Sequence, residues 1–156
     1  MRWQNHKICT VCIVFAAVGR ILPAIVAGFG SVLPDLLEAG LVRHRTLTHW
    51  TPFYIITGVI MVPMARAFFL PAGLVTAFLI LGCLCHIVQD GLSRGGVPLF
   101  TPNGRRFGAG FYITRTITET LVVSGIMAIS LLVAADKGYF GEKRILGELR
   151  WLLSWH

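Results

Sequence analysis

Charged residues are scarce in this chain. Only 13% of its 156 residues are Asp, Glu, Lys or Arg, while 55% are hydrophobic, and the mean hydropathy is strongly positive. Soluble domains carry about 25% charged residues, so this composition excludes an ordinary soluble domain and indicates a membrane protein. Internal repeats, low-complexity tracts and dividing linkers are also absent, which predicts a single all-α, polytopic membrane bundle.

Acidic residues are the rarest charged group, with 7 Asp and Glu against 14 Lys and Arg and a net charge of +7. This excess suits anionic lipid head groups or a phosphate-bearing substrate. We expect no nucleic-acid partner, because the arginines are scattered between membrane segments and no nucleic-acid-binding motif is present. Membrane lipids are the expected partners, and a protein partner or a second copy of the chain are further candidates.

Cysteine is also sparse, and its 4 copies all fall inside apolar runs. Cys9 and Cys12 have the spacing of a redox motif, but the strand-helix-strand context of such motifs is missing. We therefore interpret the cysteines as small buried packing residues.

Long intervals without a charged residue or histidine predict the membrane segments. They are Ile8 to Gly19, Ile21 to Pro34, Trp50 to Ala65, Ala67 to Cys85 and Thr120 to Ala135. Only the fourth reaches the roughly 20 residues that cross a bilayer comfortably, and the third and fifth are marginal. We therefore expect three to four spanning helices.

The first two intervals, which Arg20 and the Leu22-Pro23 break separate, leave two interpretations open. Residues 8–33 form either one kinked span with an arginine inside it or a re-entrant pair of half-helices that returns to the same face. A cleaved signal peptide is set aside, because no A-x-A-like cleavage site follows at the usual place.

Two polar connections, Asp35 to Thr51 and Asp90 to Arg115, lie at one membrane face if Pro52 to Val88 is a hairpin that crosses twice. Thr51 and Pro52 predict a helix start, with Thr51 as the N-cap. Glycine and proline in the second connection predict a long irregular loop, and such loops are commonly functional.

Residues 136–156 are predicted to form an amphipathic helix that lies on the bilayer, separate from a membrane-embedded domain at residues 1–135. Its apolar face would comprise Ile145, Leu149, Leu152 and Leu153, with Trp151 and Trp155 nearby. A solvent-exposed tail is the alternative.

His86 and Asp90 are one helical turn apart at the end of the longest apolar run. Their Cβ atoms would lie about 5 to 6 Å apart on one helix face, and imidazole and carboxylate ligands suit zinc, manganese or non-haem iron. Read alone, the pair is weak evidence, because an isolated histidine at a membrane interface is more often a snorkelling or capping residue. A carboxylate buried in lipid costs about 2.5 to 3.5 kcal/mol, so it usually has a partner and a purpose.

Four ordered segments resemble a known family. Residues 30–35 read Gly-Ser-Val-Leu-Pro-Asp, residues 44–49 read His-Arg-Thr-Leu-Thr-His, residues 86–90 read His-Ile-Val-Gln-Asp, and residues 96–102 read Gly-Val-Pro-Leu-Phe-Thr-Pro. In this order they resemble the YdjM-like family, whose members are described as inner-membrane metal-dependent hydrolases and as LexA-binding. That family in turn resembles zinc-dependent phospholipases C and single-strand nucleases.

The resemblance implies a site with one or two divalent ions, with zinc favoured over manganese or iron. The implied ligands are His6, Asp35, His49, His86 and Asp90. Asp35 and His44 are the implied catalytic residues, with His44 either a ligand or an acid for the leaving group.

Four arginines are candidates to bind an anionic head group, since guanidinium pairs bidentately with phosphate. They are Arg45, Arg94, Arg105 and Arg106. The other interpretation is that they supply topological charge at the membrane surface.

The chain departs from the family pattern in two places. Where the family often has Pro-Asp-x-Asp, this chain has Pro34-Asp35-Leu36-Leu37, and Trp50 replaces the usual small residue after Thr-His. A missing carboxylate implies one metal fewer, a changed substrate, or a site that binds without turnover.

The resemblance also favours the re-entrant hairpin, because His6 and Asp35 can share an ion only if residues 8–33 begin and end on one face. The site's face would then carry Arg2, Lys7, Arg43, Arg45, Arg94, Arg105, Arg106 and Arg115, against Arg66, Lys137, Lys143, Arg144 and Arg150 on the other. The positive-inside rule then favours the cytoplasmic face of the inner (plasma) membrane.

We therefore predict an integral membrane, metal-dependent hydrolase that cleaves a phosphoester of a phospholipid or another lipid-borne substrate with metal-activated water. The alternative is a non-catalytic membrane interaction or scaffold protein with a structural or degenerate metal site. A transporter is disfavoured, because the ionisable residues cluster at segment ends rather than at mid-membrane depth. Phosphatidic-acid-type phosphatases and common zinc peptidases are excluded, since neither Ser-Gly-His nor His-Glu-x-x-His is present.

Overall fold

The computed structural model describes residues 1–38, 46–142, 144, 146–147 and 150. Helices dominate these residues, as the composition predicted. The elements are α1 (Trp3–Val18), α2 (Ile21–Gly30), α3 (Leu33–Glu38), the short 3-10 helix η1 (Leu47–His49), α4 (Thr51–Phe68), α5 (Leu70–Gly91), β1 (Val97–Pro98), β2 (Arg106–Phe107) and α6 (Ile117–Asp136).

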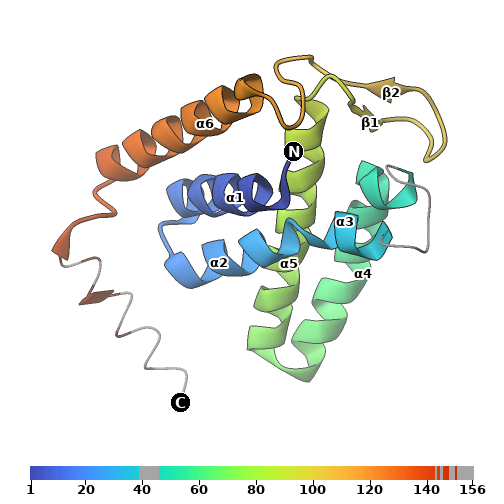
Figure 1. Cartoon of the computed structure of the whole chain (residues 1–156). Coiled ribbons are helices and arrows are strands. Elements are labelled where there is room, and N and C mark those ends of the chain that lie inside the picture. The colour runs from blue at the N-terminus through green and yellow to red at the C-terminus, as the bar shows by residue number, and fades with distance from the viewer. Residues whose placement is uncertain (39–45, 143, 145, 148–149, 151–156) are drawn as a thin grey trace.

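The helices extend away from one end of the molecule. Figure 1 shows the α1–α2 hairpin, the α4–α5 hairpin and α6 leaving the end at which the N-terminus, α3 and the two short strands lie. We call this end the polar end, because it also holds η1 and the last turn of α5, with His49, His86 and Asp90. Both polar connections expected from the sequence therefore start and finish there.

Four segments are long and apolar enough to cross a membrane: Ile21–Glu38, Thr51–Phe68, Leu70–Gly91 and Ile117–Asp136. The prediction of a polytopic all-α bundle is confirmed. Many large apolar side chains on these helices are exposed, with Phe68 at 88%, Val59 at 71% and Leu132 at 70%. Such side chains suit hydrocarbon rather than water as their surroundings.

Residues 8–33 turn back on themselves instead of forming one kinked span. The helix α1 ends at Gly19 (φ 68°), and α2 then packs against both α1 and α5. At its start α1 lies beside the start of α6, where the Arg2 N–H donates to Glu119 Oε1 (2.8 Å). At its end α1 lies beside the end of α6, where Lys137 Nζ donates to the Ala16 carbonyl (2.9 Å). The hairpin therefore returns the chain to the polar end, as the interpretation with His6 and Asp35 on one face required.

A glycine contact sets how closely α2 approaches α5. A Cβ added at Gly82 of α5 would overlap the Ala27 carbonyl of α2 and crowd the Ser31 N–H. Small residues commonly allow membrane helices to pack at short distance. This contact matters for the site, because Ser31 and the following helix α3 both reach toward His86.

Two details of the sequence prediction were wrong. Helix α4 begins at Thr51 with Trp50, in extended conformation (φ −94°, ψ 114°), at the cap position, so Thr51 is already helical and is not the N-cap. The second connection is also not wholly irregular, because β1 and β2 pair antiparallel, with Val97 opposite Phe107. Gly96 makes this pairing possible, since its φ of 60° and its contact with the Phe107 main chain leave no room for a side chain.

The apolar face predicted for the C-terminal helix lies outside the described residues, at 145, 149 and 152–153. The division at residue 135 and the interfacial tail therefore stay predictions. Among the described residues of this region, the Tyr139 ring packs edge-on against Phe15 of α1, with ring centroids 5.9 Å apart.

Candidate metal centre

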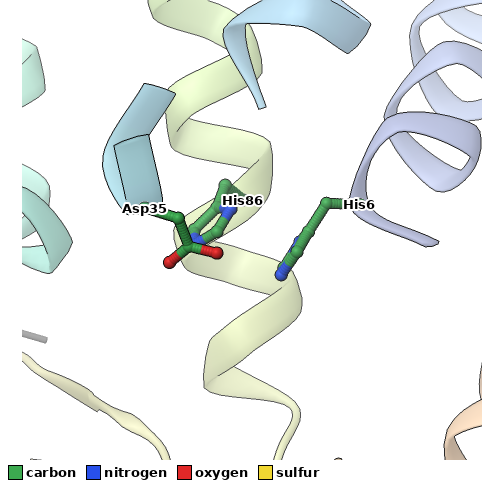
Figure 2. A group of neighbouring side chains, drawn as sticks. All are labelled: His6, Asp35 and His86. Carbon is green, nitrogen blue, oxygen red and sulfur yellow. The ribbon is translucent and has the colours of Figure 1, made fainter. Parts of the chain in front are cut away.

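Five polar side chains from four helical elements meet at the polar end. His6 comes from α1, Asp35 from α3, His49 from η1, and His86 and Asp90 from the last turns of α5. Figure 2 shows His6, Asp35 and His86 reaching from three different elements toward one place. The structure thus brings together the five residues for which the resemblance implied a shared site. We call these five residues the histidine cluster.

The cluster is almost completely buried. His49 and His86 are 0% exposed, His6 is 1% exposed and Asp90 is 2% exposed. Asp35 is the most open member, with 12% of its side chain exposed. Ionisable groups buried to this degree require partners.

The Nδ1 atom of each imidazole faces a hydrogen-bond acceptor. His86 Nδ1 lies 2.6 Å from the Ser31 carbonyl oxygen, and a carbonyl can only accept, so this nitrogen carries the proton. His49 Nδ1 lies 2.9 Å from Glu38 Oε1, where a buried carboxylate accepts in the same way. In neutral His49 and His86 the Nε2 atom is therefore a lone-pair donor, the form that binds metals.

His6 is oriented in the same manner. Its Nδ1 lies 2.8 Å from Gln89 Oε1, and Gln89 Nε2 donates to Thr10 Oγ1 (2.9 Å). In this orientation of the amide, its oxygen faces His6. The His6 and His86 rings also stack, with centroids 3.8 Å apart and planes 22° apart. His6 Nε2 is thus turned toward the same region as the other two.

Two Nε2 atoms face each other at short distance. His49 Nε2 and His86 Nε2 are 3.0 Å apart, and with both Nδ1 atoms protonated neither Nε2 carries a proton. Two lone pairs repel at this distance unless a cation, either a proton or a metal ion, lies between them.

Asp35 indicates which cation fits. Its Oδ1 lies 3.4 Å from His49 Nε2 and 3.6 Å from His86 Nε2, yet among the described residues neither Asp35 Oδ1 nor His6 Nε2 has a hydrogen-bond partner. A buried polar atom left without a partner costs about 1 to 3 kcal/mol. One proton between two histidines cannot satisfy all of these atoms, whereas a metal ion at their centre could.

The distances suit a small divalent ion. Zinc binds nitrogen at about 2.0 to 2.1 Å in tetrahedral sites, which places neighbouring ligand atoms about 3.4 Å apart. The distances of His49 Nε2 and His86 Nε2 from each other, from Asp35 Oδ1 and from Asp90 Oδ2 range from 3.0 to 3.9 Å.

The cluster and the neighbouring Glu38 contain several groups of three residues whose ligand atoms lie within 4.8 Å of one another. They are His6, Asp35 and His86; His49, His86 and Asp90; and Asp35, Glu38 and His49. The donor set is therefore compatible with zinc, manganese or iron.

Asp90 has further partners. Its Oδ1 accepts from the α-ammonium of Met1 at 2.8 Å and lies 3.4 Å from His6 Nε2, while its Oδ2 faces His49 and His86. The carboxylate therefore joins α1 to the rest of the cluster.

Sequence reasoning did not find the residues that orient the imidazoles. Glu38, 5% exposed, lies one turn after Asp35 and accepts from His49 and from Thr48 Oγ1. It supplies a carboxylate close to the place where the family often has a second aspartate. The available signal for Glu38 was that acidic residues are rare in this chain, which has only 7 of them. Gln89 gave no signal, because its role depends on a contact with His6 83 positions away.

Two of the other predicted site residues, His44 and Arg45, lie outside the described residues. Arg94, Arg105 and Arg106 are exposed on the connection that follows α5, and the Arg105 guanidinium lies 5.7 Å from the centre of the Phe107 ring. Their role in binding substrate stays a prediction.

Comparison with known proteins identifies a family. The model of a family described as YdjM inner membrane protein matches residues 1–154. No curated protein and no solved structure matches the chain.

Proposed function

Because the chain belongs to the YdjM inner membrane protein family, we propose that its histidine cluster is the metal centre of a membrane-embedded hydrolase. One observation carries the proposal: the Nδ1 atoms of three buried imidazoles face acceptors, while ligand atoms of His6, Asp35 and His86, and of His49, His86 and Asp90, lie within 4.8 Å of one another. A purely structural polar network would satisfy every buried polar atom, whereas among the described residues His6 Nε2 and Asp35 Oδ1 have no hydrogen-bond partner.

The residues of the cluster would have different roles in this function. His6, His49, His86 and Asp90 would hold one or two ions, with Asp35 as a further ligand at the more open side. A divalent ion bound there would lower the pKa of a bound water from 15.7 toward about 7 and stabilise negative charge on a phosphoryl oxygen. Asp35 is the cluster residue best placed to meet a substrate, because its side chain is the most exposed of the five.

The substrate class follows from the surroundings. The cluster lies at the ends of candidate membrane spans, with α5 ending at Gly91 and α4 beginning at Thr51, so a lipid head group at the bilayer surface would lie at the same depth. We propose a phosphoester of a phospholipid or another lipid-borne compound. His44, as the acid that protonates the leaving group, remains part of this proposal, as does a site on the cytoplasmic face.

Near-complete burial of four cluster residues favours a second candidate function. Structural metal sites are closed, whereas catalytic sites keep an open position. The protein would then be a non-catalytic membrane scaffold in which the ion fastens α1, α3 and α5 together.

Metal content and hydrolysis measured together separate the two functions. The full chain would be purified in nanodiscs, its metal measured by mass spectrometry, and phosphodiester hydrolysis followed on phospholipid vesicles. For the hydrolase, His86→Ala and Asp90→Ala should lose both metal and activity, while Asp136→Asn, on the exposed end of α6, should keep both. Unchanged metal and activity in the first two variants would overturn the proposal. Metal loss without any hydrolysis by the wild-type chain would support the scaffold.

A further inference from the structure

The connection between α5 and α6 carries a basic and aromatic surface. Between Asp90 and Glu119 the sequence has no acidic residue, while it has arginines at 94, 105, 106 and 115. Large aromatic side chains are exposed on the same stretch, with Phe100 at 77%, Phe111 at 67% and Phe107 at 38%. We call Arg94, Phe100, Arg105, Arg106, Phe107 and Phe111 the ribbon surface.

The ribbon surface is held firmly on the bundle. The Ala109 N–H donates to the Gly91 carbonyl (2.8 Å), the Phe111 N–H to the Leu92 carbonyl (2.9 Å), and the Arg94 N–H to the Tyr112 carbonyl (2.9 Å). The Tyr112 side chain, only 1% exposed, donates through its hydroxyl to the Gln89 carbonyl (2.9 Å). The exposed side chains are therefore displayed by a fixed backbone.

The membrane helices fix the depth of this surface. It follows α5 and precedes α6, two candidate spans that end at Gly91 and begin at Ile117. A connection between two such ends lies where hydrocarbon gives way to head groups. Phenylalanine rings bury at the boundary between head groups and acyl chains, and arginine pairs with phosphate there.

Charge and apolar area occur together on the ribbon surface. The Arg105 guanidinium lies 5.7 Å from the centre of the Phe107 ring, so one cation and one apolar ring reach the same layer. A soluble acidic partner would explain the arginines but not the exposed phenylalanines beside them. An anionic lipid explains both, since its phosphate meets the guanidinium groups and its upper acyl carbons meet the rings.

We propose that the ribbon surface is a binding site for anionic phospholipid in the leaflet at the polar end. This binding would not depend on metal or on hydrolysis. Its chemistry selects a lipid with a net negative head group over a zwitterionic one, because residues 91–118 include four arginines and no acidic residue.

Hydrogen exchange can test this site in the intact chain. The protein would be placed in nanodiscs of phosphatidylcholine alone and of phosphatidylcholine with phosphatidylglycerol, and exchange would be followed by mass spectrometry over residues 99–113. We expect slower exchange of this stretch in the anionic discs. Unchanged exchange in α5 in the same spectra would show that the fold is intact.

Variants provide the second measurement. The double variant Arg105→Gln with Arg106→Gln should lose the slowing that phosphatidylglycerol causes and should retain fewer phosphatidylglycerol molecules in native mass spectrometry. Arg66→Gln, an exposed arginine at the other end of α4, is the matched control and should behave as wild type. Equal exchange in the two kinds of disc, or the same slowing in the double variant, would overturn the proposal. So would slowing that appears only when a soluble acidic peptide is added.

Discussion

Replacing Glu38 tests how the histidine cluster is built. Glu38 Oε1 lies 2.9 Å from His49 Nδ1, and the two residues are 5% and 0% exposed. Carboxylates that orient a metal-binding histidine typically contribute 10- to 100-fold to metal affinity, which is about 1.4 to 2.8 kcal/mol. A buried hydrogen bond to a charged group, worth about 1.5 to 3 kcal/mol, gives the same range.

Two substitutions at Glu38 should differ in size. Glu38→Gln keeps an oxygen that can accept from His49 Nδ1 but removes the charge, so we expect zinc to bind about 10-fold more weakly. Glu38→Ala also leaves the buried His49 N–H and the Thr48 hydroxyl without this acceptor, and its loss should approach 100-fold.

The assay is a competition titration of zinc against a chromogenic chelator, with the chain in nanodiscs. Cobalt absorption would report the coordination geometry in parallel. Glu142→Gln, at an exposed position of the tail, is the control and should bind zinc as wild type does. If both Glu38 variants bound zinc with wild-type affinity, the reasoning that His49 is a ligand oriented by Glu38 would be refuted.

Three further predictions concern the packing around the cluster. Cys9 is 0% exposed, so its thiol should resist maleimide in the native protein but not after denaturation, as mass spectrometry would show; rapid native labelling would contradict this. Gly82→Ala should push α2 away from α5, because the added Cβ would overlap the Ala27 carbonyl. We expect this variant to have lower thermal stability and lower zinc affinity. Gly125→Ala is the control and should lower neither, because nothing lies near the added Cβ. Glu119→Ala removes the acceptor of the Arg2 N–H and of Asn5 Nδ2 and should cost about 1 to 3 kcal/mol of stability, measured by thermal unfolding; an unchanged midpoint would show that this contact does not hold α1 to α6.

Much of the architecture could be predicted, because it depends on local properties. Apolar run length set the positions of α4, α5 and α6 closely, since a span must cover the hydrocarbon with uncharged residues. The start of α4 was wrong by one residue, because a Thr-Pro pair fits either of two cap positions. The short ribbon β1–β2 was missed, since pairs of two residues have too little alternation to detect.

Only part of the candidate site could be predicted from the spacing of its residues. The pair His86 and Asp90 could be predicted, because both lie one turn apart on a single helix. The resemblance to a family, rather than any spacing, suggested that His6, Asp35 and His49 belong with them. Glu38 and Ser31 were not predicted as partners, since their roles depend on where α3 and η1 come to lie.

By itself, the sequence determined that this chain belongs in a membrane and that its few ionisable groups gather at the ends of apolar segments. Composition and run length suffice for that, because the cost of placing charge in hydrocarbon acts on every segment separately. Only the tertiary structure decided that the α1–α2 hairpin returns His6 to Asp35 and Asp90. It also decided the state of each imidazole, because the acceptor that holds His86 Nδ1 is 55 positions away and the one that holds His6 Nδ1 is 83 positions away. Contacts of that range come from packing, which no local pattern encodes.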